Sequence, residues 1–253
     1  MRISIIGAGP AGLAAAKKAS KENDIVVFDG NNDAGKKLLL TGSGRCNIGN
    51  VNNDLSKYHS SNKELIKKII NDKNFDKVNN FFKEIGLVLK DKNGYLYPYS
   101  EKSSSVLSCL KNSLDVDFRF NTYVENIKRK DNKFIINGEV FDKVIITTGG
   151  LSYPKTGSTG EGFHLAKAFG HKVTNLNPSL MALETNTGLE KEWSGTRCEV
   201  NVSSYIVGRK IKEEHGELQL TSFGLSGICI FNLSRDIRPV SYTHLRAHET
   251  SAH

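Results

Sequence analysis

The chain has few cysteines, and none of them forms a recognisable metal or redox motif. Its 253 residues include Cys46, Cys109, Cys198 and Cys229, and no two of these stand in a C-x-x-C pair. This spacing excludes the usual zinc and dithiol motifs. Widely spaced, unpaired thiols are typical of a reducing compartment, so the sequence predicts free cysteines and no metal site.

Long apolar runs are also missing. No run approaches the roughly 18 apolar residues that a membrane-spanning helix needs. The first residues resemble a strand that begins at Arg2, and they lack the charged region, apolar segment and cleavage site of a signal peptide. We therefore expect a cytoplasmic protein without a membrane partner.

A basic cluster is absent as well, although the net charge is +8. The lysines are scattered among Asn, Asp and Glu, and no RNA-binding or helix-turn-helix signature is found. The charge is best interpreted as a lysine-rich solvated surface. No nucleic-acid partner is expected from it.

What the chain does contain is a compact motif in its first thirty residues. An apolar run over residues 3–6 leads into Gly7-Ala8-Gly9-Pro10-Ala11-Gly12, followed by an Ala-rich segment over residues 13–19. In such a strand, turn and helix, Gly7 permits the tight turn, Gly9 lets a pyrophosphate approach the backbone, and Gly12 allows close packing. The helix N terminus attracts phosphate.

A second apolar run, residues 25–28, ends at Asp29. Asp29 follows Gly9 by 20 residues, about where an acid accepts a hydrogen bond from a ribose hydroxyl. Its charge argues against a 2′-phosphate. The alternative is a flexible glycine turn in an ordinary βαβ unit, but the acid and both strands stand where a dinucleotide-binding motif requires them.

Three later segments are candidates for the same site. Residues 41–47 are rich in Gly and small polar residues and predict a loop. Residues 144–147 predict a buried strand that runs into Thr148-Gly149-Gly150, where glycines allow close backbone approach. Residues 122–130, which include Val124, predict the first strand of a small antiparallel sheet.

Beyond about residue 175 the pattern becomes alternating, which predicts a second, β-rich domain of barrel or sandwich type. The last residues differ again, because residues 233–253 contain neither Lys nor Asn. Residues 241–253 resemble a translated adapter or vector junction. A His-rich metal-binding tail is the weaker alternative.

Four stretches together resemble the HI0933-like flavoprotein family, which includes the BaiN-like NAD(P)/FAD-dependent oxidoreductases. They are residues 5–14, 35–47, 148–160 and 216–227. The resemblance implies an α/β fold: a Rossmann-like FAD-binding domain of two-dinucleotide-binding type over residues 1–175, interrupted by a mainly β inserted domain. Residues 176–238 are then expected to be the first part of that insert, and the composition of the last residues predicts a non-native tail over residues 239–253. Family members are longer, so the chain is expected to be truncated.

The motifs and the resemblance together predict an FAD site. Arg45 is expected near the flavin, where its charge would stabilise the reduced ring, although it could instead cap its own loop. Cys46 is either a redox thiol or a small packed residue. Residues 148–150 are either a cofactor contact or a plain turn. The predicted cofactor-binding residues are Gly7, Gly9, Pro10, Ala11, Gly12, Asp29, Lys37, Thr41, Gly42, Gly44, Arg45, Cys46, Asn47, Val124, Thr148, Gly149 and Gly150.

The predicted function is an FAD-dependent oxidoreductase that transfers a hydride between a reduced donor and a small organic substrate. No catalytic acid, base or nucleophile is identified. A second GxGxxG is lacking, so the donor stays open, with NAD(P)H as one candidate. The alternatives are a non-catalytic dinucleotide-binding module and, more weakly, an RNA-modifying flavoprotein. With strand edges near residues 228–233 exposed, the short chain is expected to be poorly soluble, to bind FAD weakly and to turn over no substrate.

Overall fold

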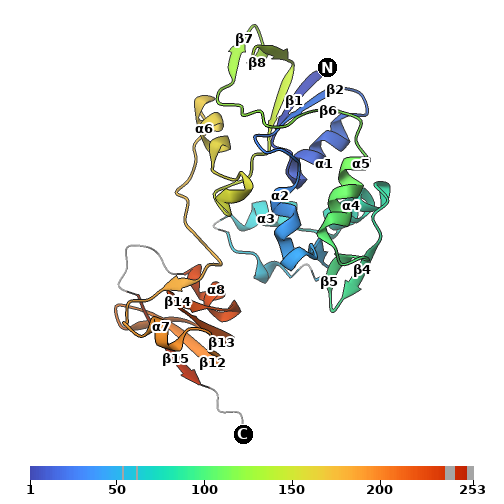
Figure 1. The fold of residues 1–253 in the computed structure, drawn as a ribbon. Coiled ribbons are helices and arrows are strands. Elements are labelled where there is room, and N and C mark those ends of the chain that lie inside the picture. The colour runs from blue at the N-terminus through green and yellow to red at the C-terminus, as the bar shows by residue number, and fades with distance from the viewer. Residues whose placement is uncertain (53, 61, 237–242, 250–253) are drawn as a thin grey trace. The chain divides into compact units, whose positions relative to one another are not determined.

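The computed structural model describes residues 1–52, 54–60, 62–236 and 243–249. The chain divides into two compact units, Met1–Val173 and Thr174–His253 (Figure 1). Each unit has its own core. They are described separately below.

A four-stranded parallel sheet forms the centre of the first unit. Its strands are β1 (Arg2–Ile6), β2 (Asp24–Phe28), β6 (Asp117–Arg119) and β10 (Lys143–Ile146), in the order β10-β1-β2-β6. Helix α1 (Pro10–Ala19) connects β1 to β2. This βαβ unit is the Rossmann-type arrangement that the sequence predicted.

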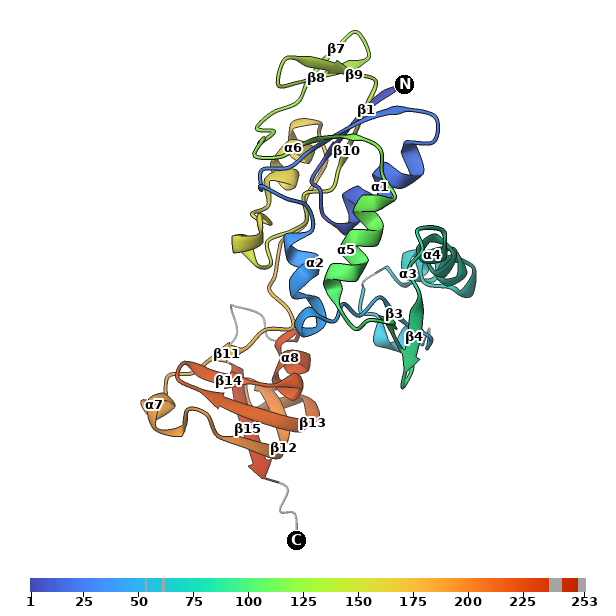
Figure 2. The same cartoon turned by 45° about the vertical axis from the view of Figure 1, so that its right-hand side comes forward.

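The two faces of this sheet are covered by different elements, because side chains alternate along each strand. Ile5 and Val27 point to one face, where they share a core with α1 and with α5 (Ser103–Asn112). These two helices lie side by side in both views (Figure 1 and Figure 2). Ile6 and Phe28 point to the other face.

A small antiparallel sheet supplies the cover of that second face. It consists of β7 (Lys128–Lys130), β8 (Lys133–Ile136) and β9 (Glu139–Phe141). Ile136 and Phe141 are fully buried there, and the ring of Phe141 meets Phe28 edge-on. Helix α6 (Glu161–Ala168) adds Leu165 to the same core.

The remaining elements of the first unit surround these layers. They are α2 (Lys36–Leu40), the short 3-10 helices η1 (Thr41–Gly44), η2 (Leu55–Lys57) and η3 (Pro154–Thr156), helices α3 (Lys63–Ile69) and α4 (Asp72–Glu84), and a three-stranded sheet of β3 (Gly49–Asn50), β5 (Tyr95–Pro98) and β4 (Leu89–Lys92).

Two predicted strands of this unit need correction. Residues 122–127 are not part of a strand, and only β7 forms within the predicted range 122–130. Val124 is nevertheless buried, and Thr122 N–H bonds to Asp29 O at 2.9 Å. The strand predicted as buried over residues 144–147 lies at the sheet edge, so β10 is only half-covered and Ile146 is 37% exposed.

The second unit contains one antiparallel sheet with a helix packed against it. The strand order is β11 (Leu183–Glu184), β14 (Gly224–Ser226), β13 (Arg209–Thr221), β12 (Arg197–Ile206) and β15 (Thr243–Glu249). The short helix α7 (Glu190–Trp193) precedes β12. A β-rich unit was predicted, but within the described residues it is an open sheet rather than a barrel or sandwich.

The segment predicted to expose strand edges, residues 228–233, forms helix α8 (Ile228–Ser234) instead. Cys229, Ile230 and Leu233 are spaced for one helix face, and they are buried against the sheet. In the C-terminal segment read as foreign, residues 243–249 pair as β15 with β12. Residues 239–242 and 250–253 of that segment lie outside the described residues.

Candidate functional site

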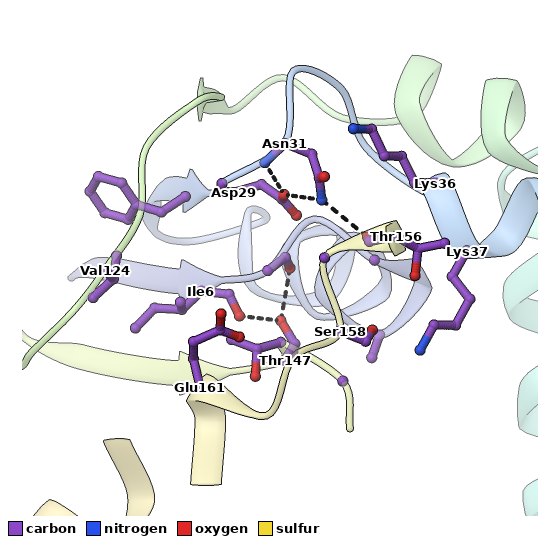
Figure 3. A pocket seen from close by; sticks show the side chains of 18 of the residues that line it. Ile6, Asp29, Asn31, Lys36, Lys37, Val124, Thr147, Thr156, Ser158 and Glu161 are labelled. Carbon is purple, nitrogen blue, oxygen red and sulfur yellow. Dashed lines mark hydrogen bonds between the residues drawn. The ribbon is translucent and has the colours of Figure 1, made fainter. Parts of the chain in front are cut away.

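A cavity of about 350 Å³ lies at the carboxyl ends of β1, β2 and β10. This is the place where ligands bind in open parallel sheets. The cavity walls come from the turn after β1, the end of β2, the start of α2, residues 122–124 and the chain that follows β10 (Figure 3). All of these belong to the first unit.

The glycine turn after β1 is shaped by close backbone contacts. Gly7 has a φ of 104°, and a Cβ there would lie 2.6 Å from the carbonyl oxygen of Thr147. A Cβ on Gly12 would lie 1.9 Å from Gly7 O. A Cβ on Gly9 would meet no atom within 4 Å. Gly7 and Gly12 are thus fixed by packing, whereas Gly9 leaves the cavity side of the turn open.

Helix α1 presents a bare N terminus to this cavity. Gly9 is the N-cap residue and offers no side chain, Pro10 occupies the first turn, and that turn has no acidic residue. The free N–H groups and the positive end of the helix dipole favour an anion there. Lys36 and Lys37 line the same cavity and add positive charge.

Asp29 is held firmly at the end of β2. Its Oδ2 accepts from Ala8 N at 2.7 Å, and its Oδ1 accepts from Asn31 N at 2.8 Å and Asn31 Nδ2 at 2.9 Å. Asn31 Nδ2 also donates to Thr156 O at 3.2 Å. The predicted ribose acceptor is therefore oriented by the glycine turn on one side and by Asn31 on the other (Figure 3).

Three residues of the site are missing from the predicted set of cofactor-binding residues. The hydroxyl of Thr147 lies 2.9 Å from both Ile6 O and Gly7 O, and so ties the end of β10 to the glycine turn. Tyr123 lines the cavity and is 63% exposed, and its ring lies so close to Gly30 that a Cβ there would be 2.4 Å away. Asn31 follows Asp29 by two residues, and this short spacing was the one sequence signal that could have indicated a contact between the two side chains.

The predicted residues divide into two groups. Those that line the cavity are Gly7, Gly9, Pro10, Ala11, Asp29, Lys37, Val124, Thr148 and Gly149. Those outside its lining are Gly12, Gly150, Thr41, Gly42, Gly44, Arg45, Cys46 and Asn47. Gly12 is packed beneath the turn, whereas residues 41–47 form a separate loop at the end of α2.

This loop, predicted as irregular, begins with the short η1 turn, and unusual backbone conformations occur both within η1 and after it. Gly42, Ser43 and Cys46 all have a positive φ, between 54° and 58°. Cys46 is buried, and burial raises the pKa of its thiol, with a smaller opposing effect of a hydrogen bond from Thr41. The guanidinium of Arg45 lies 5.8 Å from the Tyr97 ring and bonds to Gly42 O.

A dinucleotide fits the cavity on the structure's own features. The open face of Gly9, the uncapped helix and the two lysines suit a pyrophosphate, and Asp29 suits a ribose hydroxyl.

Among the described residues, no group of three or more His, Cys, Asp or Glu could hold a metal ion. Within the same residues, no helix is long and apolar enough to cross a membrane.

Comparison with known proteins yields a family match over most of the chain. The model of the HI0933-like protein Rossmann domain matches residues 1–236. The 3-dehydro-bile acid delta(4,6)-reductase of Clostridium scindens is 33% identical over 246 residues, which are 93% of this chain and 60% of the reductase. The ribosomal RNA dihydrouridine synthase of Haemophilus influenzae is 29% identical, with 93% and 61% covered.

The chain thus spans about three fifths of the length of these relatives. Among solved structures, the 3-ketosteroid-Δ4-(5α)-dehydrogenase of Rhodococcus jostii RHA1 superposes with a TM-score of 0.44 at 15% identity. That alignment covers 60% of this chain and 46% of the dehydrogenase. A superposition this loose supports no functional conclusion.

Proposed function

The chain belongs to the HI0933-like protein family, and we propose that it is the FAD-binding part of an FAD-dependent oxidoreductase. The protein would transfer a hydride between a reduced donor and a small organic substrate. One observation carries the proposal: the bare N terminus of α1 and the carboxylate of Asp29 face one cavity at the strand ends. This is the combination that a dinucleotide needs.

The residues of the cavity have distinct tasks in this proposal. The helix N terminus, Lys36 and Lys37 hold the pyrophosphate, and Asp29 holds the adenine ribose. Val124, buried in the cavity wall, offers its main chain to the adenine. FAD, when bound, supplies the hydride chemistry, and the protein orients it and excludes water.

Two further segments would serve the flavin half. Thr148 and Gly149 line the cavity just after β10 and allow the chain to pass close to the cofactor. Gly150, outside the lining, belongs to the same turn. Residues 41–47 lie at the far end of α2, and Arg45 there is an exposed cation. In the proposal, that cation stabilises negative charge on the reduced flavin.

The substrate class is proposed from the chemistry that two relatives' names share. A delta(4,6)-reductase reduces carbon–carbon double bonds, and dihydrouridine is uridine with its 5,6 double bond reduced. In a 3-dehydro steroid and in uracil alike, such a bond is conjugated to a carbonyl group. We infer that the acceptor of this protein is a double bond conjugated to a carbonyl, which is electron-poor enough to take a hydride.

Flavin spectroscopy tests this proposal. Full-length protein, purified, incubated with FAD and desalted, is expected to keep a visible flavin absorbance. Anaerobic addition of NADH or NADPH should bleach that band if NAD(P)H is the donor, and dithionite serves as the control for reducible flavin. Colourless protein would overturn the cofactor assignment. Flavin that dithionite bleaches but neither nicotinamide does would favour the non-catalytic module or a different donor.

The RNA-modifying alternative gains one observation, because two relatives are named ribosomal RNA dihydrouridine synthases. Salt-sensitive binding of a ribosomal RNA fragment would support it. If the protein binds the RNA fragment no better than a neutral protein of the same size does, the RNA-modifying alternative fails and a small organic molecule remains the proposed substrate. A cytoplasmic location stays a prediction from the sequence.

The domain limits also remain proposals: residues 1–175 for the FAD domain, 176–238 for the first part of the insert and 239–253 for a non-native tail. Because the relatives are longer, turnover is expected to need more chain than these 253 residues provide. The check is the flavin-to-protein ratio after gel filtration, with and without the C-terminal part of a relative in place of residues 241–253. One FAD per short chain would show that the extra part is dispensable for the cofactor.

A further inference from the structure

The carboxylate of Asp29 has almost no hydrogen-bonding capacity left for a ligand. A carboxylate offers about four acceptor positions. Three donors already point at this one: Ala8 N, Asn31 N and Asn31 Nδ2. Two of them share Oδ1, so the remaining position is on Oδ2. Asp29 can therefore take one ribose hydroxyl but not two.

The adenine ribose of a dinucleotide has two adjacent hydroxyls, and both are donors. A second acceptor must therefore lie next to Asp29 if both are to be satisfied. Asn31 is in that place, because its amide nitrogen bonds to Asp29 Oδ1 and it lines the same cavity. Within the described part of the chain, no donor bonds to its amide oxygen Oδ1.

The orientation of that amide follows from its neighbours. Nδ2 faces two acceptors, Asp29 Oδ1 and Thr156 O, so nitrogen and oxygen cannot be exchanged without losing both bonds. Gly157 also packs against this group, since a Cβ there would lie 2.5 Å from Nδ2. The amide oxygen is thus held by contacts from two separate parts of the chain.

We propose that Asn31 is a second ribose-binding residue, whose Oδ1 accepts one adenine-ribose hydroxyl while Asp29 Oδ2 accepts the other. This rests on the proposed dinucleotide function. The same arrangement disfavours a phosphorylated ribose, because both N–H groups of the Asn31 amide are engaged with protein acceptors and none is left to donate to a phosphate. Asn31 is then a specificity-determining residue as well as a support for Asp29.

The test uses ligands that lack one hydroxyl each. Affinities of FAD, ADP, 2′-deoxy-ADP and 3′-deoxy-ADP are measured by calorimetry for the wild type, Asp29→Ala, Asn31→Ala and the matched control Asn32→Ala. Asn32 is an exposed neighbouring asparagine with no side-chain hydrogen bond among the described residues. Urea unfolding shows whether each variant folds, and Asn31→Ser replaces Asn31→Ala if that variant does not.

The wild type is expected to bind ADP about three- to tenfold more tightly than the deoxynucleotide that lacks the hydroxyl bound by Asn31, the range for one neutral hydrogen bond. The preference over the other deoxynucleotide should be about ten- to a hundredfold, because the Asp29 carboxylate that accepts from the missing hydroxyl is charged. Asn31→Ala should lose the preference for one hydroxyl, and Asp29→Ala the preference for the other. Asn32→Ala should match the wild type. Both variants losing the same preference, or Asn31→Ala weakening all three nucleotides equally, would overturn the proposal for Asn31. Wild-type protein that binds neither FAD nor ADP would overturn the proposed function itself.

Discussion

Two glycine-rich segments of the first unit behave differently, although the sequence assigned both to the cofactor. The turn over residues 7–12 lies against the end of β10. Two of its three motif glycines, Gly7 and Gly12, are fixed by packing, because a Cβ on either would overlap a backbone oxygen. The loop over residues 41–47 lies outside the cavity lining. A Cβ on Gly44 would meet nothing within 4 Å.

The difference lies in what holds each segment in shape. The turn is held by strands on either side, through bonds such as Gly7 N to Phe28 O at 2.7 Å. The loop is held by bonds within itself, as from Cys46 N to Thr41 O at 3.0 Å, and by the packing of Cys46 into the core, and it contains left-handed residues such as Ser43. Left-handed conformations of non-glycine residues cost about 1–2 kcal/mol each. Ser43 is exposed, so packing does not explain its conformation, and unexplained strain of this kind makes the loop a candidate for a ligand contact.

The largest effect is expected from Gly12→Ala, which places a Cβ 1.9 Å from Gly7 O. Backbone on both sides must move, so the free energy of unfolding should fall by about 3 kcal/mol or more. Urea denaturation measures it, with Ala14→Gly as a helix control that should cost about 1 kcal/mol. A loss no greater than the control's would show that the turn is not fixed by packing.

Gly9→Ala is expected to separate packing from binding in the same turn. Its φ of −73° suits alanine, and the added Cβ meets no protein atom. Stability should change by less than about 1 kcal/mol, the scale of an N-cap substitution. FAD affinity should fall about tenfold, about 1.4 kcal/mol, because the methyl group stands where the pyrophosphate approaches. Unchanged affinity in a flavin titration would place the pyrophosphate elsewhere.

Arg45→Ala examines the loop. Its contact with Tyr97 is exposed, so the fold should lose about 0.5–1 kcal/mol at most. If Arg45 lies beside the flavin, removing its charge should lower the two-electron flavin potential by about 30 mV, equivalent to 1.4 kcal/mol. Arg129→Ala, on the β7–β8 sheet, is the matched control. If the flavin potential of Arg45→Ala equals that of the control, Arg45 does not act on the flavin and only stabilises its own loop.

The smallest effect concerns the thiol of Cys46. Burial raises its pKa in the folded protein, so folding favours the protonated form. The resulting stability is present below the unfolded pKa and is lost as the pH rises through the folded value. Unfolding free energy should therefore decline in the alkaline range, less steeply in Cys46→Ala. Rapid alkylation of Cys46 at pH 8 in folded protein, as fast as in urea, would contradict this burial.

The sequence predicted the βαβ motif well because all its determinants lie within thirty residues. It failed where neighbours come from far along the chain. Val124 is buried without belonging to a strand, and β10 is only half-buried because it lies at the edge of the sheet. Asn31 gains its role from Thr156, 125 residues away. Residues 228–233 form a short apolar run, and short apolar runs do not distinguish strand from helix.

The pairing of β1 with β10 also determines when the parallel sheet can be completed during synthesis of the polypeptide. Thr147, which bonds to Gly7, follows it by 140 residues. At a synthesis rate of about 5–20 residues per second, the first strand waits about 7–28 s for this partner. During that interval one edge of β1 stays open to chaperones or to other nascent chains. The glycine turn is therefore synthesised long before Thr147, Thr148 and Gly149, which complete the cavity beside it.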